Sequence, residues 1–272
     1  MMRAVVTDPI CPLMSGPSCR CGRADEALGG MIVEVLEDTG TAWRLVRTHY
    51  GYTGYAPEEC LLFGEETAER WAGREKKVVL RGTCDVLAFP DVAAWPAASL
   101  VRGDIVAPSG EERDGWQRVL LPGGQEGYLR SSVLGQLHTA PVHKDEAAMR
   151  AALVDAALSY RGVSYRWGGK TPMGIDCSGL CSMAYLLCGV IIWRDAAIRE
   201  GYPIRPIPRE KMGPGDLLFF PGHVAMYLGD GRYIHATARA GDDGVAINSL
   251  RPGHAGYRAD LAGSLTAVGS IF

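Results

Sequence analysis

The spacing of hydrophobic positions changes along the second half of the chain and marks a helix followed by a β-meander. A glycine-rich stretch precedes the helical pattern and Gly189 follows it, which favours a helix that begins near Cys177. Its apolar positions are Leu180, Met183, Ala184 and Leu187, and three later apolar runs, separated by glycine turns, cover 216–220, 223–228 and 232–236. The pattern predicts an α+β domain with a cysteine in the first turn of a helix.

Cysteine and histidine occupy positions in these elements that suit thiol hydrolysis. The unpaired N–H groups of a helix N-terminus favour a thiolate at Cys177 and can bind the oxyanion of an acyl intermediate. A three-residue or bulged turn at 229–231, with Leu228 facing Arg232, would place His223 and His235 on one face, whereas a plain two-residue turn would separate them. We therefore predict a nucleophile, a base and an orienting histidine. The alternatives are a buried structural cysteine at Cys177, a hydrogen-bonded strand histidine at His223 and a core histidine at His235.

Four blocks in this order resemble the NlpC family of bacterial papain-like cell-wall cysteine peptidases. They are Tyr165-Arg166-Trp167-Gly168-Gly169, Asp176-Cys177-Ser178-Gly179, Gly222-His223-Val224-Ala225-Met226-Tyr227-Leu228-Gly229 and Tyr233-Ile234-His235-Ala236. The resemblance covers about the last half of the chain, and Gly222 stands where relatives often carry a serine. It implies hydrolysis of peptidoglycan stem peptides between γ-D-glutamate and a diamino acid.

The resemblance also implies roles for residues around the nucleophile. Tyr165 would lie at the active site and help to bind the oxyanion, while Asp176 and Ser178 would line the substrate subsites. Trp167 is a further candidate for substrate contact. For Tyr165 and Trp167, aromatic packing ahead of a glycine turn is the alternative.

The first half of the chain contains a repeat. Trp43 and Tyr55 recur as Trp116 and Tyr128 with the same spacing, within short alternating apolar runs. The repeat predicts two small all-β barrels, and the pattern resembles bacterial SH3-like domains. The expected organisation is a first barrel at 1–64, a charged connector at 65–76, a second barrel at 77–138 and the peptidase domain at 139–272, which starts with a helix from Asp145 to about Tyr160.

Two roles are open for the barrels. They could bind cell-wall polymer through exposed tyrosines such as Tyr50, Tyr52 and Tyr55, or the first barrel could close one end of the cleft. For the tyrosines, packing in the barrel core and in cross-strand pairs is the alternative. Some two-barrel relatives resemble dipeptide-releasing enzymes that require a free N-terminal L-alanine. A closing wall needs a carboxylate for that ammonium group, and Asp176 and Glu58 are the candidates. A solvated surface acid is the alternative for Glu58.

Composition excludes several classes of protein. The chain has 272 residues, 47% of them hydrophobic, and a net charge of −3, which gives no footprint for nucleic acid. No apolar run suggests a membrane span, and the N-terminus lacks the pattern of a signal peptide. We therefore expect a cytoplasmic enzyme, or an exported one whose leader is absent from this chain.

No metal or cofactor is expected. Eight cysteines are present, but none is spaced as a zinc knuckle, and unligated thiols are the expectation for Cys11, Cys19 and Cys21. The segment 191–212, with three prolines, is expected to form an irregular loop at the cleft. The oligomeric state and the choice between L-lysine and diaminopimelate do not follow from the sequence.

Rival functions differ in the bond that is cut. A related thiol hydrolase, such as an N-acetylmuramoyl-L-alanine amidase, an acyltransferase or a wall-remodelling hydrolase, would use the same Cys177. A wall-binding protein with a degenerate catalytic domain would bind sacculi without turnover.

Overall fold

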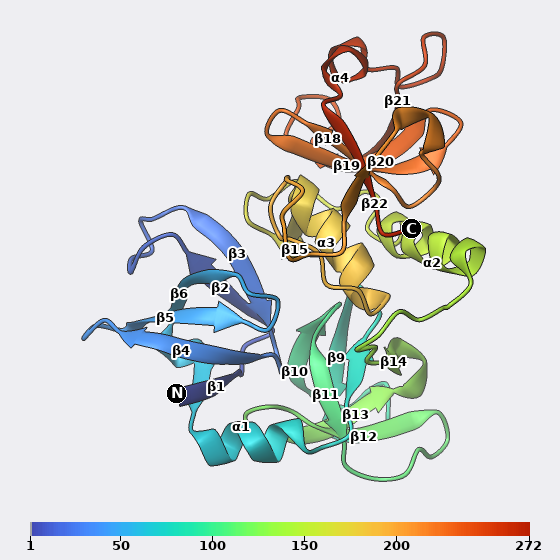
Figure 1. Cartoon of the computed structure of the whole chain (residues 1–272). Helices are drawn as coiled ribbons and strands as arrows, with labels where there is room; N and C mark the ends of the chain where they lie inside the picture. Colours follow the sequence, from blue (N-terminus) through green and yellow to red (C-terminus); the bar gives the residue numbers. More distant parts are fainter. Residues whose placement is uncertain (1) are drawn as a thin grey trace. The chain divides into compact units, whose positions relative to one another are not determined.

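The computed structural model describes residues 2–272, which divide into two compact units on either side of the Leu137–His138 bond (Figure 1). The first unit holds two seven-stranded antiparallel sheets with orders β3-β2-β6-β5-β4-β1-β7 and β10-β9-β13-β12-β11-β8-β14. Each strand of the first sheet therefore has a counterpart seven places later. The repeat in the sequence corresponds to two copies of one strand order, and Trp43 and Trp116 open the equivalent strands β5 and β12.

The strands of the first sheet are β1 (Met2–Val6), β2 (Ile10–Met14), β3 (Arg23–Leu28), β4 (Ile32–Asp38), β5 (Trp43–Thr48), β6 (Thr53–Pro57) and β7 (Leu61–Phe63). Those of the second are β8 (Lys77–Val79), β9 (Thr83–Leu87), β10 (Pro96–Val101), β11 (Ile105–Pro108), β12 (Trp116–Leu120), β13 (Glu126–Arg130) and β14 (Leu134–Gln136). Short 3₁₀ turns, η1 (Glu58–Cys60) and η2 (Ser131–Val133), precede β7 and β14. We call the two copies the first and second β-domains.

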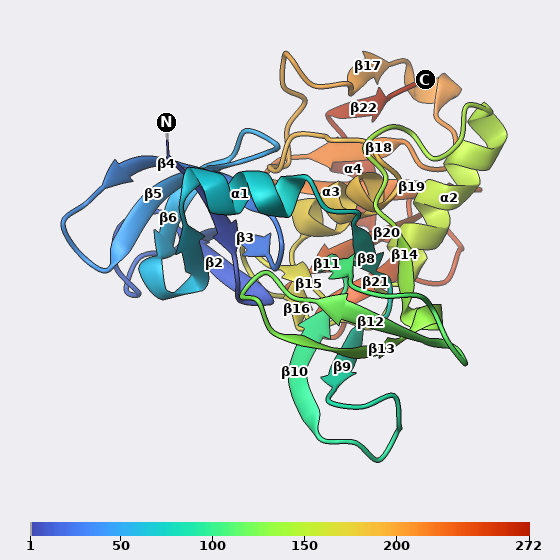
Figure 2. The same ribbon diagram turned by 90° about the horizontal axis from the view of Figure 1, so that it is seen from below.

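The helix α1 (Glu65–Ala72) connects the β-domains and packs on β1 (Figure 2). Its Trp71 donates an indole N–H to the Gly30 carbonyl at 2.8 Å, and Ala68 and Trp71 share an apolar cluster with Val5 and Ala107. Because the cluster takes residues from both β-domains, burial of apolar surface holds the two copies together.

Asp104 closes this junction with hydrogen bonds. Its carboxylate is 1% exposed and accepts the Gly29 N–H at 2.9 Å and the Val101 N–H at 2.7 Å. Burial raises the pKa of Asp104 well above its usual range. At Gly30, φ is +81° and an added Cβ would lie 2.4 Å from the Ile105 carbonyl oxygen, so only glycine fits there.

The second unit is an α+β domain around a six-stranded antiparallel sheet of order β17-β22-β18-β19-β20-β21. Helices α2 and α3 pack against each other and on β19, and residues of α4 cover the apolar cluster around Leu218 and Tyr233. The elements are α2 (Glu146–Leu158), β15 (Lys170–Thr171), β16 (Gly174–Ile175), α3 (Cys177–Leu187), β17 (Arg205–Ile207), η3 (Arg209–Lys211), β18 (Leu217–Phe220), β19 (His223–Gly229), β20 (Arg232–Thr237), β21 (Gly244–Ser249), α4 (Ala259–Ser264) and β22 (Ala267–Ser270).

The predicted N-terminal helix of this unit is confirmed as α2, whose N-cap Asp145 accepts the Ala148 N–H at 2.8 Å. The expectation of an irregular loop at 191–212 is wrong for its last third. Residues Arg205–Ile207 form β17, which pairs with β22 and is the edge strand of the sheet. Pro206 is tolerated there because an edge strand has one unpaired side. No helix among residues 2–272 is long and apolar enough to cross a bilayer.

Candidate active site

Cys177 is the first residue of α3, as the helical spacing predicts. Asp176 is the N-cap, and its carboxylate accepts the Gly179 N–H at 2.6 Å. A Cβ at Gly179 would lie 2.1 Å from the Gly169 carbonyl oxygen, so the helix can approach this loop only where the side chain is absent. The thiol of Cys177 is 8% exposed and lies at the positive end of the helix dipole.

The electrostatics of Cys177 combine opposing influences. Burial raises the pKa of the thiol, and the neighbouring Asp176 raises it further. Backbone N–H groups of Val224 and Ser178 donate to the sulfur and lower the pKa, and so does the charge of Arg194. Because the net shift is upward, the resting group is a thiol, and attack requires a base that removes its proton.

The histidines lie on one face, as expected for a bulged turn. Tyr227 pairs with Tyr233 and Gly229 with Arg232, so the expected pairing of Leu228 with Arg232 is wrong and Leu228 forms the bulge. The turn itself has two residues, Asp230 and Gly231, with φ of 50° and 72°. The bulge adds the residue that a plain two-residue turn would lack, and the faces of β19 and β20 stay matched.

The two imidazole rings are hydrogen-bonded to each other. Nε2 of His223 lies 2.8 Å from Nδ1 of His235, and Nε2 of His235 lies 2.7 Å from Oδ1 of Asn248 on β21. An amide oxygen only accepts, so Nε2 of His235 carries the proton and Nδ1 of His235 accepts from Nε2 of His223. This order leaves Nδ1 of His223 unprotonated and able to act as a base.

Burial lowers the pKa of both histidines to about 4, and for His223 the neighbouring His235 lowers it further. Both rings are therefore neutral near pH 7, which the chain of donors and acceptors requires. The ladder between β19 and β20 stops at Met226, and the Val224 N–H beyond it donates to the sulfur of Cys177. The strand that carries His223 is thereby held against the nucleophile.

Asn248 was not among the residues predicted from the sequence. It directly follows the apolar run Val245-Ala246-Ile247 on β21 and is 6% exposed. It pairs with Tyr233, two residues from His235. A polar residue in a buried strand is a signal of a hydrogen-bonded role, but the strand pairing that brings it to His235 is not visible in the sequence.

The other residues around the nucleophile differ in exposure. Tyr165 bridges to Ile175, and burial, with Cys177 and Asp176 nearby, raises the pKa of its phenol to about 12. The phenol stays protonated and can donate a hydrogen bond. Trp167 is 70% exposed, so close packing of its ring is not observed, whereas Ser178 is buried and its Oγ accepts from Arg194 at 2.8 Å.

Comparison of the chain with a family profile and with known relatives agrees with this geometry. The NlpC/P60 family profile matches residues 162–261. A protein of Lysinibacillus sphaericus named dipeptidyl-peptidase 6 is 44% identical over 274 residues, with 100% of both chains covered. The chain belongs to the NlpC/P60 family. The family expected from the four sequence blocks is thus confirmed.

Further comparisons extend the similarity beyond the NlpC/P60 domain. A Bacillus cereus protein named gamma-D-glutamyl-L-lysine dipeptidyl-peptidase is 28% identical over 229 residues, which cover 78% of this chain and 66% of that one. The crystal structure of an NlpC/P60 family protein from Bacillus cereus has a TM-score of 0.80 over 98% of both chains, at 23% identity. The whole arrangement of two β-domains and a peptidase fold is therefore shared.

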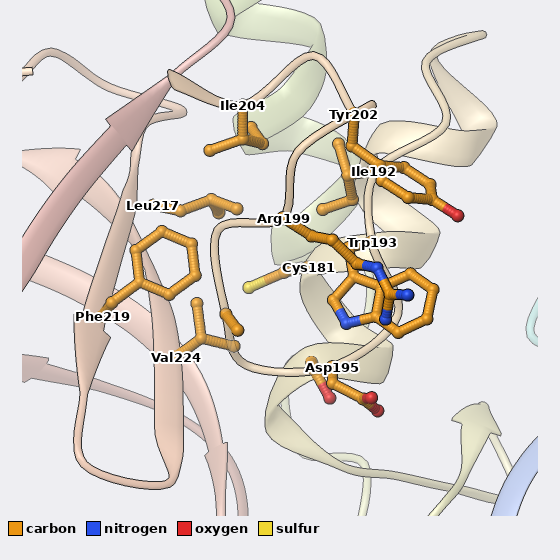
Figure 3. Close-up of a pocket in the computed structure, with 12 residues that line it drawn as sticks. Cys181, Ile192, Trp193, Asp195, Arg199, Tyr202, Ile204, Leu217, Phe219 and Val224 are labelled. Atoms are coloured by element: carbon orange, nitrogen blue, oxygen red, sulfur yellow. The ribbon is translucent and has the colours of Figure 1, made fainter. Parts of the chain in front are cut away.

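Beside the nucleophile of this NlpC/P60 domain lies a narrow pocket of about 10 Å³, with space for about one water molecule (Figure 3). Ser178 and Val224 line it, and the segment after α3 contributes Trp193, Asp195 and Arg199. The Arg199 guanidinium lies 3.9 Å from the centre of the Trp193 ring. The segment after α3 thus forms one wall of the pocket that Ser178 lines.

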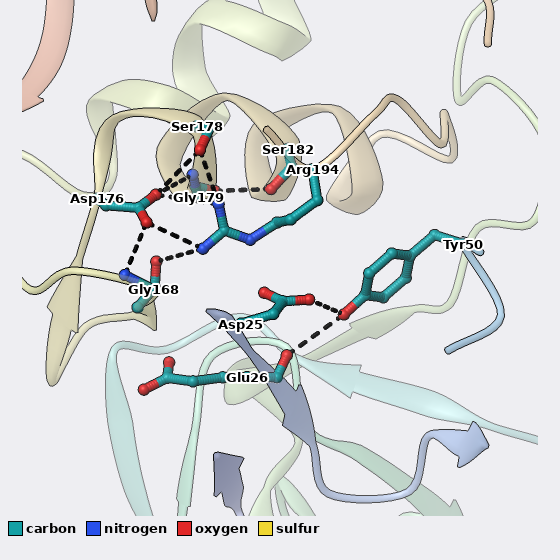
Figure 4. Close-up of polar contacts among 10 residues, drawn as sticks. Asp25, Glu26, Tyr50, Gly168, Asp176, Ser178, Gly179, Ser182 and Arg194 are labelled. Atoms are coloured by element: carbon teal, nitrogen blue, oxygen red, sulfur yellow. Dashed lines mark hydrogen bonds and ion pairs between the residues drawn. The ribbon is translucent and has the colours of Figure 1, made fainter. Parts of the chain in front are cut away.

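Two residues of the first β-domain were also candidates. Glu58 forms an ion pair with Arg44 at 2.9 Å, and its side chain is 48% exposed, so a role in binding substrate stays a prediction. Of the two alternatives for Tyr50, an exposed residue that binds polymer and a core residue, the structure supports the second. This tyrosine is 7% exposed and donates to Asp25 at 2.6 Å, because a buried hydroxyl needs a partner (Figure 4).

Proposed function

We propose that the protein is a cysteine peptidase that hydrolyses the γ-D-glutamyl–L-diamino acid bond of peptidoglycan stem peptides and releases L-Ala-D-Glu. The single observation that carries the chemistry is the hydrogen-bonded order from Asn248 through His235 to His223, which leaves a base for a cysteine at a helix start. The bond is supported by similarity to proteins named dipeptidyl-peptidase 6 and gamma-D-glutamyl-L-lysine dipeptidyl-peptidase.

Acylation begins when Nδ1 of His223 takes the proton of Cys177 as the sulfur attacks the γ-carbonyl carbon of the D-glutamyl residue. The carbonyl oxygen becomes an oxyanion, which N–H groups at the start of α3 and the phenol of Tyr165 are placed to stabilise. The imidazolium then gives its proton to the leaving amine of the diamino acid. The products of this half are a free amine and a γ-glutamyl thioester on Cys177.

Deacylation reverses the proton transfers with water as the nucleophile. His223 takes a proton from water, the hydroxide attacks the thioester carbon, and the thiolate leaves and regains the proton. The low pKa of His223, about 4, keeps the ring neutral and ready to accept a proton at each half-reaction. Asn248 and His235 keep the accepting nitrogen on the side of the sulfur throughout.

We also propose that the substrate carries a free N-terminal L-alanine, whose ammonium group needs a carboxylate partner. Asp176 is a poor candidate, because its oxygens already accept from Gly168, Gly179 and Arg194. Asp195 lines the pocket beside Ser178, and Glu58 stays the candidate from the first β-domain. Asp195→Asn and Glu58→Gln should each be tested for a rise in KM that is specific to free-amine substrates.

The deciding experiment is mass-spectrometric analysis of cleavage of L-Ala-γ-D-Glu-L-Lys and its diaminopimelate analogue, each with a free and an acetylated N-terminus. Release of L-Ala-D-Glu only from the free amines supports a dipeptide-releasing enzyme. Equal cleavage of both forms would instead indicate an open cleft and a wall-remodelling role. With a muramoyl peptide as a parallel substrate, release of the intact peptide from muramic acid would indicate an amidase.

Action in the cytoplasm on peptide fragments is part of the same proposal. A requirement for a free alanine amine excludes intact peptidoglycan, in which muramic acid blocks that amine. Vigorous digestion of whole sacculi by the pure protein would contradict it, and fractionation of the native host would test the location directly.

A further inference from the structure

A buried ion pair includes the residue that precedes the nucleophile in the sequence. Arg194 is 1% exposed, and its two terminal nitrogens donate to the two oxygens of Asp176 at 3.0 and 3.1 Å (Figure 4). The same guanidinium donates to Ser178 Oγ at 2.8 Å and to the Gly169 carbonyl at 3.3 Å. The guanidinium of Arg194 therefore makes a bidentate interaction with the carboxylate of Asp176.

Asp176 is required where it stands, although its charge opposes catalysis. Its oxygens accept the Gly168 N–H at 2.8 Å and the Gly179 N–H at 2.6 Å, so it both holds the preceding loop and caps α3. It is also the residue next to Cys177, and a negative charge there disfavours the thiolate that forms during attack. Asp176 raises the pKa of the Cys177 thiol, and Arg194 lowers it.

The groups that face the Cys177 sulfur come from several elements. Asp176 and Tyr165 precede α3, Cys181 lies one turn along α3, and Arg194 comes from the segment after α3. On β19, His223 precedes Val224, whose backbone N–H donates to the sulfur. Near pH 7 the thiols, the phenol and the imidazole are neutral. The cation of Arg194 and the anion of Asp176 are the formal charges in this set.

We propose that Arg194 is a positioning residue that acts through Asp176: its charge cancels that of the cap, and the Cys177 thiolate then forms beside a neutral pair. The inference rests on the proposed cysteine-peptidase function. Arg194 itself is not placed against the scissile bond. Its role is to neutralise the charge of Asp176, so that Asp176 can cap α3 without disfavouring the Cys177 thiolate.

The test measures thiol reactivity separately from peptide cleavage. The rate of alkylation of Cys177 by iodoacetamide is followed from pH 5 to 10, with Cys177→Ala as the blank for the other cysteines. We expect Arg194→Gln to move the profile to higher pH and to slow alkylation at pH 7 by roughly tenfold or more, because an uncompensated charge lies nearby. Asp176→Asn should move the profile the other way.

The double variant Asp176→Asn with Arg194→Gln distinguishes charge from structure. With both charges removed, we expect the rate of alkylation to return to within about threefold of that of the original protein. Arg194→Lys should keep the positive charge but lose the bidentate hydrogen bonding of the guanidinium to Asp176. A double variant as slow as Arg194→Gln, or an unchanged profile in Arg194→Gln, would overturn the proposal. If Arg194→Gln does not fold, a slower Asp176→Asn would overturn it instead.

Failure of the proposed function gives a different result. If the original protein does not cleave any stem peptide while the alkylation profiles shift as described, the substrate assignment is wrong and the compensation of charge stands. If the peptides are cleaved and the profiles do not move, the compensation is wrong and the peptidase assignment stands.

Discussion

Asn248→Ala should slow catalysis without removing any group that touches the sulfur. The side chain of Asn248 contributes one hydrogen bond of 2.7 Å, which fixes the proton on Nε2 of His235. His235 is fully buried, so no solvent replaces the lost acceptor. Without it, the reversed order of protons becomes competitive. Nδ1 of His223, the proposed acceptor of the Cys177 proton, then carries a proton and cannot act as a base.

The size of the effect follows from the cost of an unsatisfied buried N–H, about 1–3 kcal/mol. Applied to the barrier, this cost corresponds to a decrease in kcat of roughly five- to 150-fold, with KM little changed, because each 1.4 kcal/mol is a factor of about ten. The assay is steady-state cleavage of L-Ala-γ-D-Glu-L-Lys, with circular dichroism to verify the fold. Asn248→Asp, which still accepts the N–H, should retain more activity than Asn248→Ala.

Ser249→Ala is the matched control on the same strand. Ser249 is fully buried, and its Oγ accepts the Arg251 N–H at 3.0 Å. Its recorded side-chain hydrogen bonds do not include the rings of His223 or His235. We expect this variant to lose stability and to keep its kcat. If Asn248→Ala keeps kcat within twofold of the original protein while its fold is intact, the argument that Asn248 sets the tautomer is refuted.

Three further predictions test other parts of the structure. Cys177→Ala should remove turnover and change the melting temperature little, whereas His235→Ala should leave a slower, measurable rate; equal losses in both would contradict the division of roles. The folded-state pKa of His235, about 4, lies below its unfolded value near 6.5, so its contribution to stability is full above pH 6.5 and is lost as the pH falls towards 4. The free energies of unfolding from urea titrations at pH 7 and 4.5 should therefore differ by up to about 3 kcal/mol on account of His235, and His235→Gln should reduce the difference. Asp104→Ala removes the side-chain acceptor of the Val101 N–H and leaves the Gly29 N–H with the Pro9 carbonyl at 3.4 Å, so it should destabilise the first unit by about 2 kcal/mol, while alkylation of Cys177 should not change.

Local patterns in the sequence were sufficient to predict features that lie within one helix or one pair of neighbouring strands. The apolar spacing after Cys177 predicts α3, and the alternation along 223–236 predicts two strands that carry the histidines. The turn between these strands was predicted as three-residue or bulged, and the bulge at Leu228 satisfies it. Side-chain alternation in a strand has a period of two, so the residue count between the strands decides the face whichever residue forms the bulge.

The repeat in the first half is another property of the sequence alone. The equal spacing of Trp43 and Tyr55, and of Trp116 and Tyr128, identifies two copies, and both sheets follow the same strand order. The contact between the copies does not follow from that spacing. Asp104 lies 75 residues from Gly29 in the chain, and only the packing of α1 and both β-domains brings the carboxylate to that N–H.

By itself, the sequence predicted the roles of Cys177, His223 and His235 and identified the duplication in the first half, because a helix start, a strand register and an equal spacing can each be read from the order of residues. The tertiary structure decided how these groups are tuned. Asn248 reaches His235 through the pairing of β20 with β21, and Arg194 reaches Asp176 from a segment without regular structure. Burial then shifts the pKa of Cys177 and His223, and burial depends on everything packed around a residue, which no local pattern encodes.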